Sequence, residues 1–130
     1  MAKQTLRTPL GRVLGLGSAK AGTGHFWSQR VTAAALVLLG AWFVISLLLV
    51  PDFGYGAVQD WLDRPWHAVL MALLAITLAW HSSLGVQVVI EDYVHQPFAR
   101  LVSLVASKFL HALLAAGAVF AVLKLALGTP

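Results

Sequence analysis

Three long apolar runs constrain this chain more than any other feature of its sequence. They extend from about residue 31 to 50, from 66 to 90 and from 101 to 127. Each is long enough to cross a bilayer core of about 30 Å as a helix, which takes roughly 20 residues. Lipid offers no partner for unpaired backbone N–H and C=O groups, so such segments must be helical. The sequence therefore predicts an all-α integral membrane protein with three transmembrane helices.

The composition argues against an ordinary soluble domain. Of the 130 residues, 59% are hydrophobic and only 11% are charged, against about 25% charged in a typical soluble domain. The chain has no cysteine, which excludes disulfides, thiolate metal sites and iron–sulfur ligation on this chain. Its net charge of +4 does not indicate nucleic acid, because the basic residues are not gathered into one surface.

The basic residues instead predict how the chain is oriented in the membrane. Those that precede the first run, with no acidic residue among them, are Lys3, Arg7, Arg12, Lys20 and Arg30. The first connection, from Asp52 to Arg64, carries three aspartates and a single arginine. By the positive-inside rule we expect a cytoplasmic N-terminus and second connection, and an external first connection. Residues 1–30 would form a basic, Gly-rich cytoplasmic arm, and residues 31–130 the membrane domain.

His81 is the leading functional candidate, because ionisable groups at membrane depth are costly and often functional. Gly85 follows four residues later on the same helical face. Asp92 lies eleven residues on, about 20° from His81 in projection if the helix continues that far. Imidazole supplies an axial ligand to haem iron, and a missing side chain lets a flat macrocycle approach the helix. The alternative is a histidine bonded across a helix interface, with glycine for close helix packing.

Two further histidines leave a self-contained cytochrome b open. His111 lies about ten residues into the third run, and an antiparallel pairing with the second run brings it near the depth of His81. His67 lies fourteen residues before His81, about 21 Å along the same helix, a spacing typical of helices that carry two haems. It also neighbours Trp66, and a histidine at the membrane interface needs no ligand role.

Polar residues lie at the expected cytoplasmic ends of the first and second apolar runs. Tyr93, next to Asp92, could donate a hydrogen bond to a lipophilic carbonyl while the acid delivers protons. Composition alone favours the alternative, an interfacial tyrosine anchor beside a solvated turn. Arg30, just before the first run, could bind an anionic group such as a haem propionate or simply set the topology.

Together these motifs resemble the D-type hydrophobic membrane anchor subunit of succinate dehydrogenase, the respiratory complex II. That family shows a haem-ligating histidine, a glycine four residues later and an Asp-Tyr pair followed by Val, as in His81-Ser-Ser-Leu-Gly-Val-Gln-Val-Val-Ile-Glu-Asp-Tyr-Val94. The segment His25-Phe-Trp-Ser-Gln-Arg-Val-Thr-Ala33 resembles the start of the family's first helix. Ser82 and Ser83 depart from the pattern, since bulkier apolar residues are common there.

The resemblance implies a role for each matched position. His81, beside Gly85, would be one axial ligand of a single haem b, with the other ligand from a companion C-type anchor. Tyr93 would hydrogen-bond a carbonyl of ubiquinone, Asp92 would support that site, and Arg30 would contact a haem propionate. The other implied partners are an iron–sulfur subunit and a flavoprotein subunit, docked on the inner face of a bacterial cytoplasmic membrane.

Other functions stay open at this stage. A fumarate reductase anchor that uses a low-potential quinone is one alternative, because nothing in the sequence fixes the direction of electron flow. A cofactor-free assembly factor or small transporter subunit would need the three helices but none of the site residues.

Overall fold

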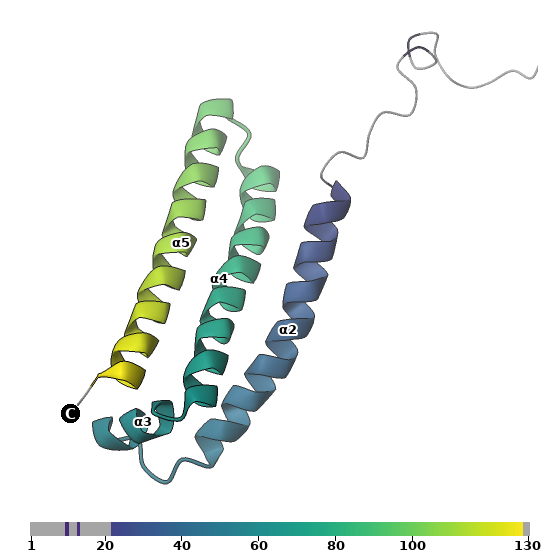
Figure 1. The fold of residues 1–130 in the computed structure, drawn as a ribbon. Coiled ribbons are helices and arrows are strands. Elements are labelled where there is room, and N and C mark those ends of the chain that lie inside the picture. Colours follow the sequence, from purple (N-terminus) through teal and green to yellow (C-terminus); the bar gives the residue numbers. More distant parts are fainter. Residues whose placement is uncertain (1–9, 11–12, 14–21, 129–130) are drawn as a thin grey trace, which may run out of the picture.

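Four helices make up the part of the chain that the computed structural model describes, residues 10, 13 and 22–128. They are α2 (Gly22–Leu48), α3 (Tyr55–Leu62), α4 (Pro65–Tyr93) and α5 (Pro97–Leu127), and no strand occurs among these residues (Figure 1). The helices α2, α4 and α5 are long and apolar enough to cross a membrane. The prediction of an all-α protein with three membrane-spanning helices is confirmed.

The three long helices form a row with α4 in the middle (Figure 1). On one side α4 packs against α2 and on the other against α5, whereas α2 and α5, both fully described, do not pack together. The short α3 lies across one end of the row, against α4 and α5. We call this the α3 end, and the opposite end, with the α4–α5 connection, the turn end.

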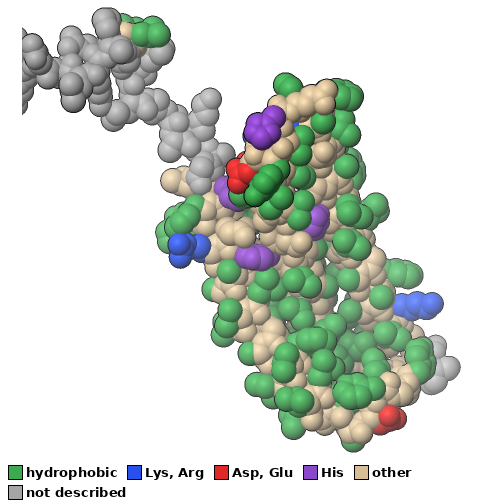
Figure 2. Space-filling model, turned by 180° about the vertical axis from the view of Figure 1, so that it is seen from behind, with side chains coloured by type: hydrophobic (Ala, Val, Ile, Leu, Met, Phe, Trp, Pro, Cys, Tyr) green, Lys and Arg blue, Asp and Glu red, His purple; other side chains and the backbone are tan. Residues whose placement is uncertain are grey.

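Almost none of the apolar surface is buried within the chain. Among the described residues, only Leu62 and Val122 are buried hydrophobic side chains. Figure 2 shows one face of the row, largely covered by hydrophobic side chains with only a few charged groups. A surface of this kind needs lipid or partner chains to cover it, because contiguous apolar patches this large are not stable in water.

The long helices extend beyond the expected spans toward the turn end. Helix α4 begins at Pro65, whose ring suits the first helical turn, and reaches Tyr93 instead of about residue 90. Helix α5 begins at Pro97, four residues before the expected start. Helix α2 begins at Gly22 instead of about residue 31, so it crosses the expected boundary between arm and membrane domain. Polar residues in this first part of α2 lower its hydropathy without preventing a helix; most of the predicted arm lies outside the described residues.

The connection that we expected to be an external loop contains the helix α3, which is a correction to the prediction. Its Leu62 side chain is only 4% exposed, and Trp61 stacks on Trp42 of α2 with 5.8 Å between ring centroids. The amide Nε2 of Gln59 donates to the carbonyl of Gly128 beyond α5, at 3.3 Å. One apolar face therefore folds this segment back onto the long helices, although its glycines and aspartates are typical of a loop.

Candidate functional site

His81 lies near the middle of α4, and its half-buried ring faces α2. Its Nδ1 is 2.9 Å from the hydroxyl Oγ1 of Thr32. The Thr32 hydroxyl in turn lies 2.7 Å from the backbone carbonyl of Ser28, four residues earlier on α2, a bond that helical threonines commonly make. His81 is thus held across the α2–α4 interface by one of its two ring nitrogens. Within the described residues the structure has no hydrogen bond to its Nε2.

Gly85 lies one turn closer to the turn end on the same face of α4. A Cβ atom built at Gly85 would meet no atom within 4 Å. Close packing between helices of this chain therefore does not explain the glycine. Gly40 and Gly117 have equally open surroundings. What distinguishes Gly85 is that its open space lies one helical turn from His81.

His111 projects from α5 toward α4 and has contacts at both ring nitrogens. Its Nδ1 donates to the backbone carbonyl of Ser107 at 2.7 Å, and its Nε2 lies 3.2 Å from the hydroxyl of Ser82. Ser82 is one residue from His81 and hence about 100° around α4. The two histidines accordingly have different neighbours, and the structure does not assemble them into one site.

His67 has a structural role at the α3 end. Its Nδ1 donates to the carbonyl of Trp61 at 2.7 Å, since a carbonyl oxygen can only accept. Its ring stacks on that of Trp61 with 4.5 Å between centroids, and it lies 5.9 Å from the ring of Trp42. These contacts join α4 to both α3 and α2, and they account for a histidine at this position.

Asp92 and Tyr93 form the last turn of α4, both exposed. Because α4 continues unbroken to Tyr93, Asp92 falls on the same face as His81 and Gly85, as the spacing predicted. The distance along the axis from His81 to Asp92 is about 16 Å. The Tyr93 side chain is 79% exposed, so its hydroxyl is accessible to a ligand or a partner chain.

Arg30 lies on another side of α2. Its guanidinium sits 4.6 Å from the centre of the Phe26 ring, and the side chain is exposed. It lies two positions before Thr32, which corresponds to about 200° around the helix. The structure therefore does not bring Arg30 together with His81 within this chain.

Two polar atoms near the start of α2 are buried without a hydrogen-bond partner among the described residues. They are Nε2 of His25 and Oε1 of Gln29. Both residues share a helical face with Thr32, at offsets of seven and three residues. This side of α2 is therefore polar from its first turn up to the contact with His81.

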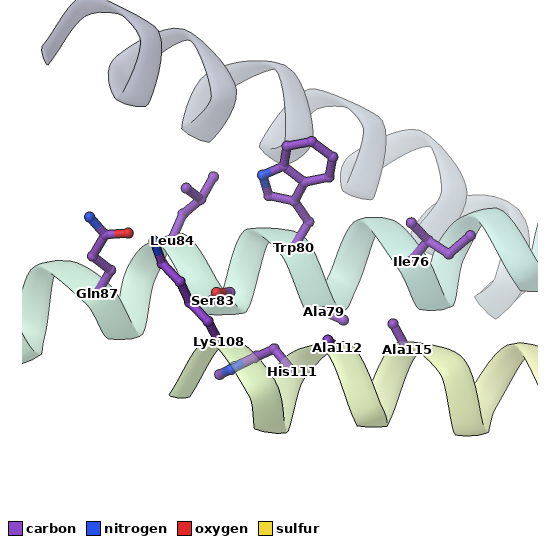
Figure 3. Close-up of a pocket in the computed structure, with 10 residues that line it drawn as sticks. All are labelled: Ile76, Ala79, Trp80, Ser83, Leu84, Gln87, Lys108, His111, Ala112 and Ala115. Carbon is purple, nitrogen blue, oxygen red and sulfur yellow. The ribbon is translucent and has the colours of Figure 1, made fainter. Parts of the chain in front are cut away.

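A groove of about 360 Å³ lies along the contact between α4 and α5, and His111 of α5 lines it (Figure 3). Its polar lining consists of Ser83, Gln87, Lys108 and His111. Figure 3 shows the long side chain of Lys108 extending from α5 over α4. Neither His81 nor Tyr93 lines this groove, so it is separate from the predicted site.

Comparison with known proteins decides the family. The family model of the succinate dehydrogenase/fumarate reductase transmembrane subunit matches residues 4–124. This chain belongs to that family. The resemblance found in the sequence motifs is thereby confirmed.

Several relatives of this family member are succinate dehydrogenase hydrophobic membrane anchor subunits. That of Paracoccus denitrificans is 31% identical over 121 residues, which cover 93% of each chain. That of Rickettsia bellii is 38% identical over 78 residues, 60% of this chain and 62% of the relative. A second, from Rickettsia conorii, is 34% identical over 60% of this chain and 63% of the relative. The matches thus span less than two thirds of the length of the Rickettsia proteins. No solved structure matches this chain.

The family match covers all the candidate site residues from Arg30 to Tyr93. Within the described part of this family member, no three His, Asp or Glu side chains come together to hold a metal ion. Thr32 is the one residue at the site whose role the sequence did not reveal. The sequence carried one signal: Thr32 is the last polar residue before the apolar run from Ala33 to Ile45, and Ser or Thr side chains in membrane helices commonly hydrogen-bond across to a neighbouring helix.

Proposed function

We propose that this chain is a membrane anchor subunit of a succinate:quinone oxidoreductase of a bacterial cytoplasmic membrane. It would help bind one haem b and the ubiquinone reduction site, and it would anchor the flavoprotein and iron–sulfur subunits together with a C-type anchor. The observation that carries the proposal is the position of His81. It lies midway along a membrane-spanning helix that ends in Asp92-Tyr93, in a chain related to named anchor subunits.

The residues around His81 fit a haem in two respects. One ring nitrogen is bound to Thr32, while the other has no hydrogen bond among the described residues and is available as a ligand. The open space beside Gly85 leaves room for a flat ring at the next turn. One histidine is a complete contribution from this chain if a second anchor supplies the opposite ligand, so the missing metal-binding cluster is not in conflict with the proposal.

A bound haem would supply a one-electron carrier at membrane depth. This chain's part would be to hold it: His81 would ligate the iron, Gly85 would leave room for the ring, and Arg30 would bind a propionate in the assembled complex. The guanidinium of Arg30 is exposed and lies over the Phe26 ring.

Quinone reduction takes two electrons and two protons, and the end of α4 offers groups for both binding and proton supply. The phenol O–H of Tyr93 would donate a hydrogen bond to a carbonyl oxygen of ubiquinone. Asp92, the preceding residue, would support that site or its proton supply. The exposure of both side chains supports a site completed by partner chains.

Two alternatives differ in how well the observations support them. A fumarate reductase anchor shares the family, but the named relatives are succinate dehydrogenase subunits. A self-contained cytochrome b that uses His111 or His67 is disfavoured. Both ring nitrogens of His111 have contacts within the chain. The ring of His67 is stacked on Trp61 at the α3 end, about 21 Å along α4 from His81.

The test is a reduced-minus-oxidised visible spectrum of the complex purified in mild detergent, first with succinate and then with dithionite. The spectrum is normalised to the flavin of the complex, so that poor assembly does not imitate haem loss. We expect a b-type signal that appears with succinate. We expect His81→Ala to remove it and the matched variant His111→Ala to leave it unchanged.

Each other outcome has a definite meaning. Loss of the signal in both variants would favour an intrachain cytochrome. A signal that only dithionite elicits would separate the haem from the succinate pathway. A complex without any haem signal would overturn the haem assignment and leave the anchor role resting on quinone binding and partner identity.

A further inference from the structure

The contacts of the Thr32 hydroxyl indicate which ring nitrogen of His81 carries the proton. The Thr32 hydroxyl lies close to three potential acceptors: the carbonyl of Ser28 at 2.7 Å, the carbonyl of Gln29 at 3.2 Å and Nδ1 of His81 at 2.9 Å. A hydroxyl has one proton to donate and two lone pairs with which to accept. Carbonyl oxygens cannot donate, so the short contact with Ser28 takes the Thr32 proton.

The tautomer of His81 follows from this assignment. If the Thr32 proton points at Ser28, its oxygen presents a lone pair to Nδ1 of His81. A bare Nδ1 would set two lone pairs against each other at 2.9 Å, which is repulsive. The contact is favourable only if Nδ1 carries the proton and donates it to Thr32. Neutral imidazole has one N–H, so Nε2 is then the nitrogen with the free lone pair.

We infer that Thr32 is a positioning residue that holds His81 with Nε2 unprotonated and ready to bind iron. The inference rests on the proposed function, in which His81 is a haem ligand. Metal-ligating histidines almost always donate their other N–H to an acceptor, and this bond fixes the ring orientation and raises the basicity of the ligand. Here the acceptor is a hydroxyl on the neighbouring helix, backed by the main chain of α2.

The chain offers closely matched variants to test this inference in the assembled complex. Thr32→Val keeps the shape of the side chain and removes the acceptor. Thr32→Ser keeps the hydroxyl and removes only the methyl group. Ser28→Ala is the control: it changes a polar residue one turn away but retains the backbone carbonyl that accepts from Thr32.

Two readouts separate positioning from a general loss of stability: haem content per flavin and the midpoint potential of the haem by redox titration. We expect Thr32→Val to weaken haem binding about 10- to 100-fold, the range typical of lost outer-shell partners. Its remaining haem should have a more positive potential, because a less basic imidazole stabilises the ferric form less. Thr32→Ser and Ser28→Ala should match the wild type in both measurements.

The outcomes distinguish this inference from the proposed function. If His81→Ala loses haem while Thr32→Val keeps wild-type haem content and potential, the role of Thr32 is refuted and the haem ligand stands. If His81→Ala retains haem, or the wild type has none, the ligand assignment fails and the inference fails with it. If Thr32→Val does not assemble, Thr32→Ser and Thr32→Ala decide, since only the serine should keep the wild-type potential.

Discussion

The three histidines of the membrane helices differ in what their ring nitrogens contact. His111 uses both nitrogens within the α4–α5 pair. His67 donates to a backbone carbonyl and packs in an aromatic stack at the α3 end. His81 meets a single hydroxyl. A ligand role for His81 at Nε2 therefore breaks no contact of this chain, whereas His111 would have to give up a bond that it makes within the α4–α5 pair. His67 also has no hydrogen bond at Nε2 among the described residues, but its ring is stacked on Trp61 and lies near Trp42.

At the same scale, Tyr93 can be tested by removing only its hydroxyl. We expect Tyr93→Phe to lower kcat/KM for ubiquinone about two- to tenfold, corresponding to the loss of one neutral hydrogen bond. Haem content should not change, since Tyr93 lies about 18 Å along α4 from His81. The measurement is succinate–quinone reductase activity of the purified complex.

The control for this prediction is Tyr55→Phe, because Tyr55 is the other of the two tyrosines in the chain. It is exposed at the start of α3, at the opposite end of the row. Tyr55→Phe should have wild-type activity. Equal activity in both variants would mean that the phenol of Tyr93 does not bind the quinone.

The single residues also mark what a sequence can and cannot reveal. The stripe of His81, Gly85 and Asp92 follows from helical periodicity, and the length of α4 confirms that these residues share one face. The pairing of Thr32 with His81 could not be predicted from the sequence. Spacing along one helix carries no information on how far a second helix is shifted or rotated against it.

At the scale of elements, hydropathy locates the membrane helices well and their ends less well. The polar start of α2, with His25, Gln29 and Arg30, lowers the local average without breaking the helix. The helix α3 was missed because Pro51, Asp52 and Gly54 around its start are typical of a loop. What stabilises it is contact with other elements, which a local reading cannot supply.

The anchoring of α3 gives a prediction for this element. His67→Phe should keep the stack with Trp61 and remove the bond to its carbonyl, at a cost of about 1 kcal/mol. We expect roughly fivefold faster amide hydrogen exchange in residues 57–62, measured by mass spectrometry of the detergent-solubilised complex. The haem spectrum should be unchanged.

Trp66→Phe is the matched control for that measurement, since Trp66 neighbours His67 but is 77% exposed. It should exchange like the wild type. If His67→Phe left the exchange of α3 unaltered while weakening the haem signal, His67 would be a ligand and its contact with Trp61 incidental.

At the scale of the whole molecule, the row of helices leaves α4 without a buried residue, although it has a neighbour on each side. In the most apolar parts of α2 and α4 no residue is buried, and in that of α5 only 6% of the residues are buried. Such a chain cannot complete a core by itself. Its fold makes sense as one layer of a larger helical assembly, with lipid on the surfaces that partner chains do not cover.

The orientation of the row can be measured directly because the chain has no cysteine of its own. Asp52 and Gln96 are exposed in the connections at the two ends. We expect Asp52→Cys to react with a membrane-impermeant maleimide applied to the periplasmic side of spheroplasts. Gln96→Cys should react only after the membrane is opened. The reverse pattern would contradict the assignment of the N-terminus and turn end to the cytoplasm.

The three-residue connection between α4 and α5 has a consequence for how the chain is made. Ionisable side chains within a lone membrane helix are costly to insert, and α5 carries both Lys108 and His111. Next to α4, these side chains line a groove with Ser83 and Gln87, and His111 bonds to Ser82. The free energy of insertion is lowest if both helices leave the translocon together as one hairpin. We therefore expect α4 to remain in the translocon until α5 has been synthesised.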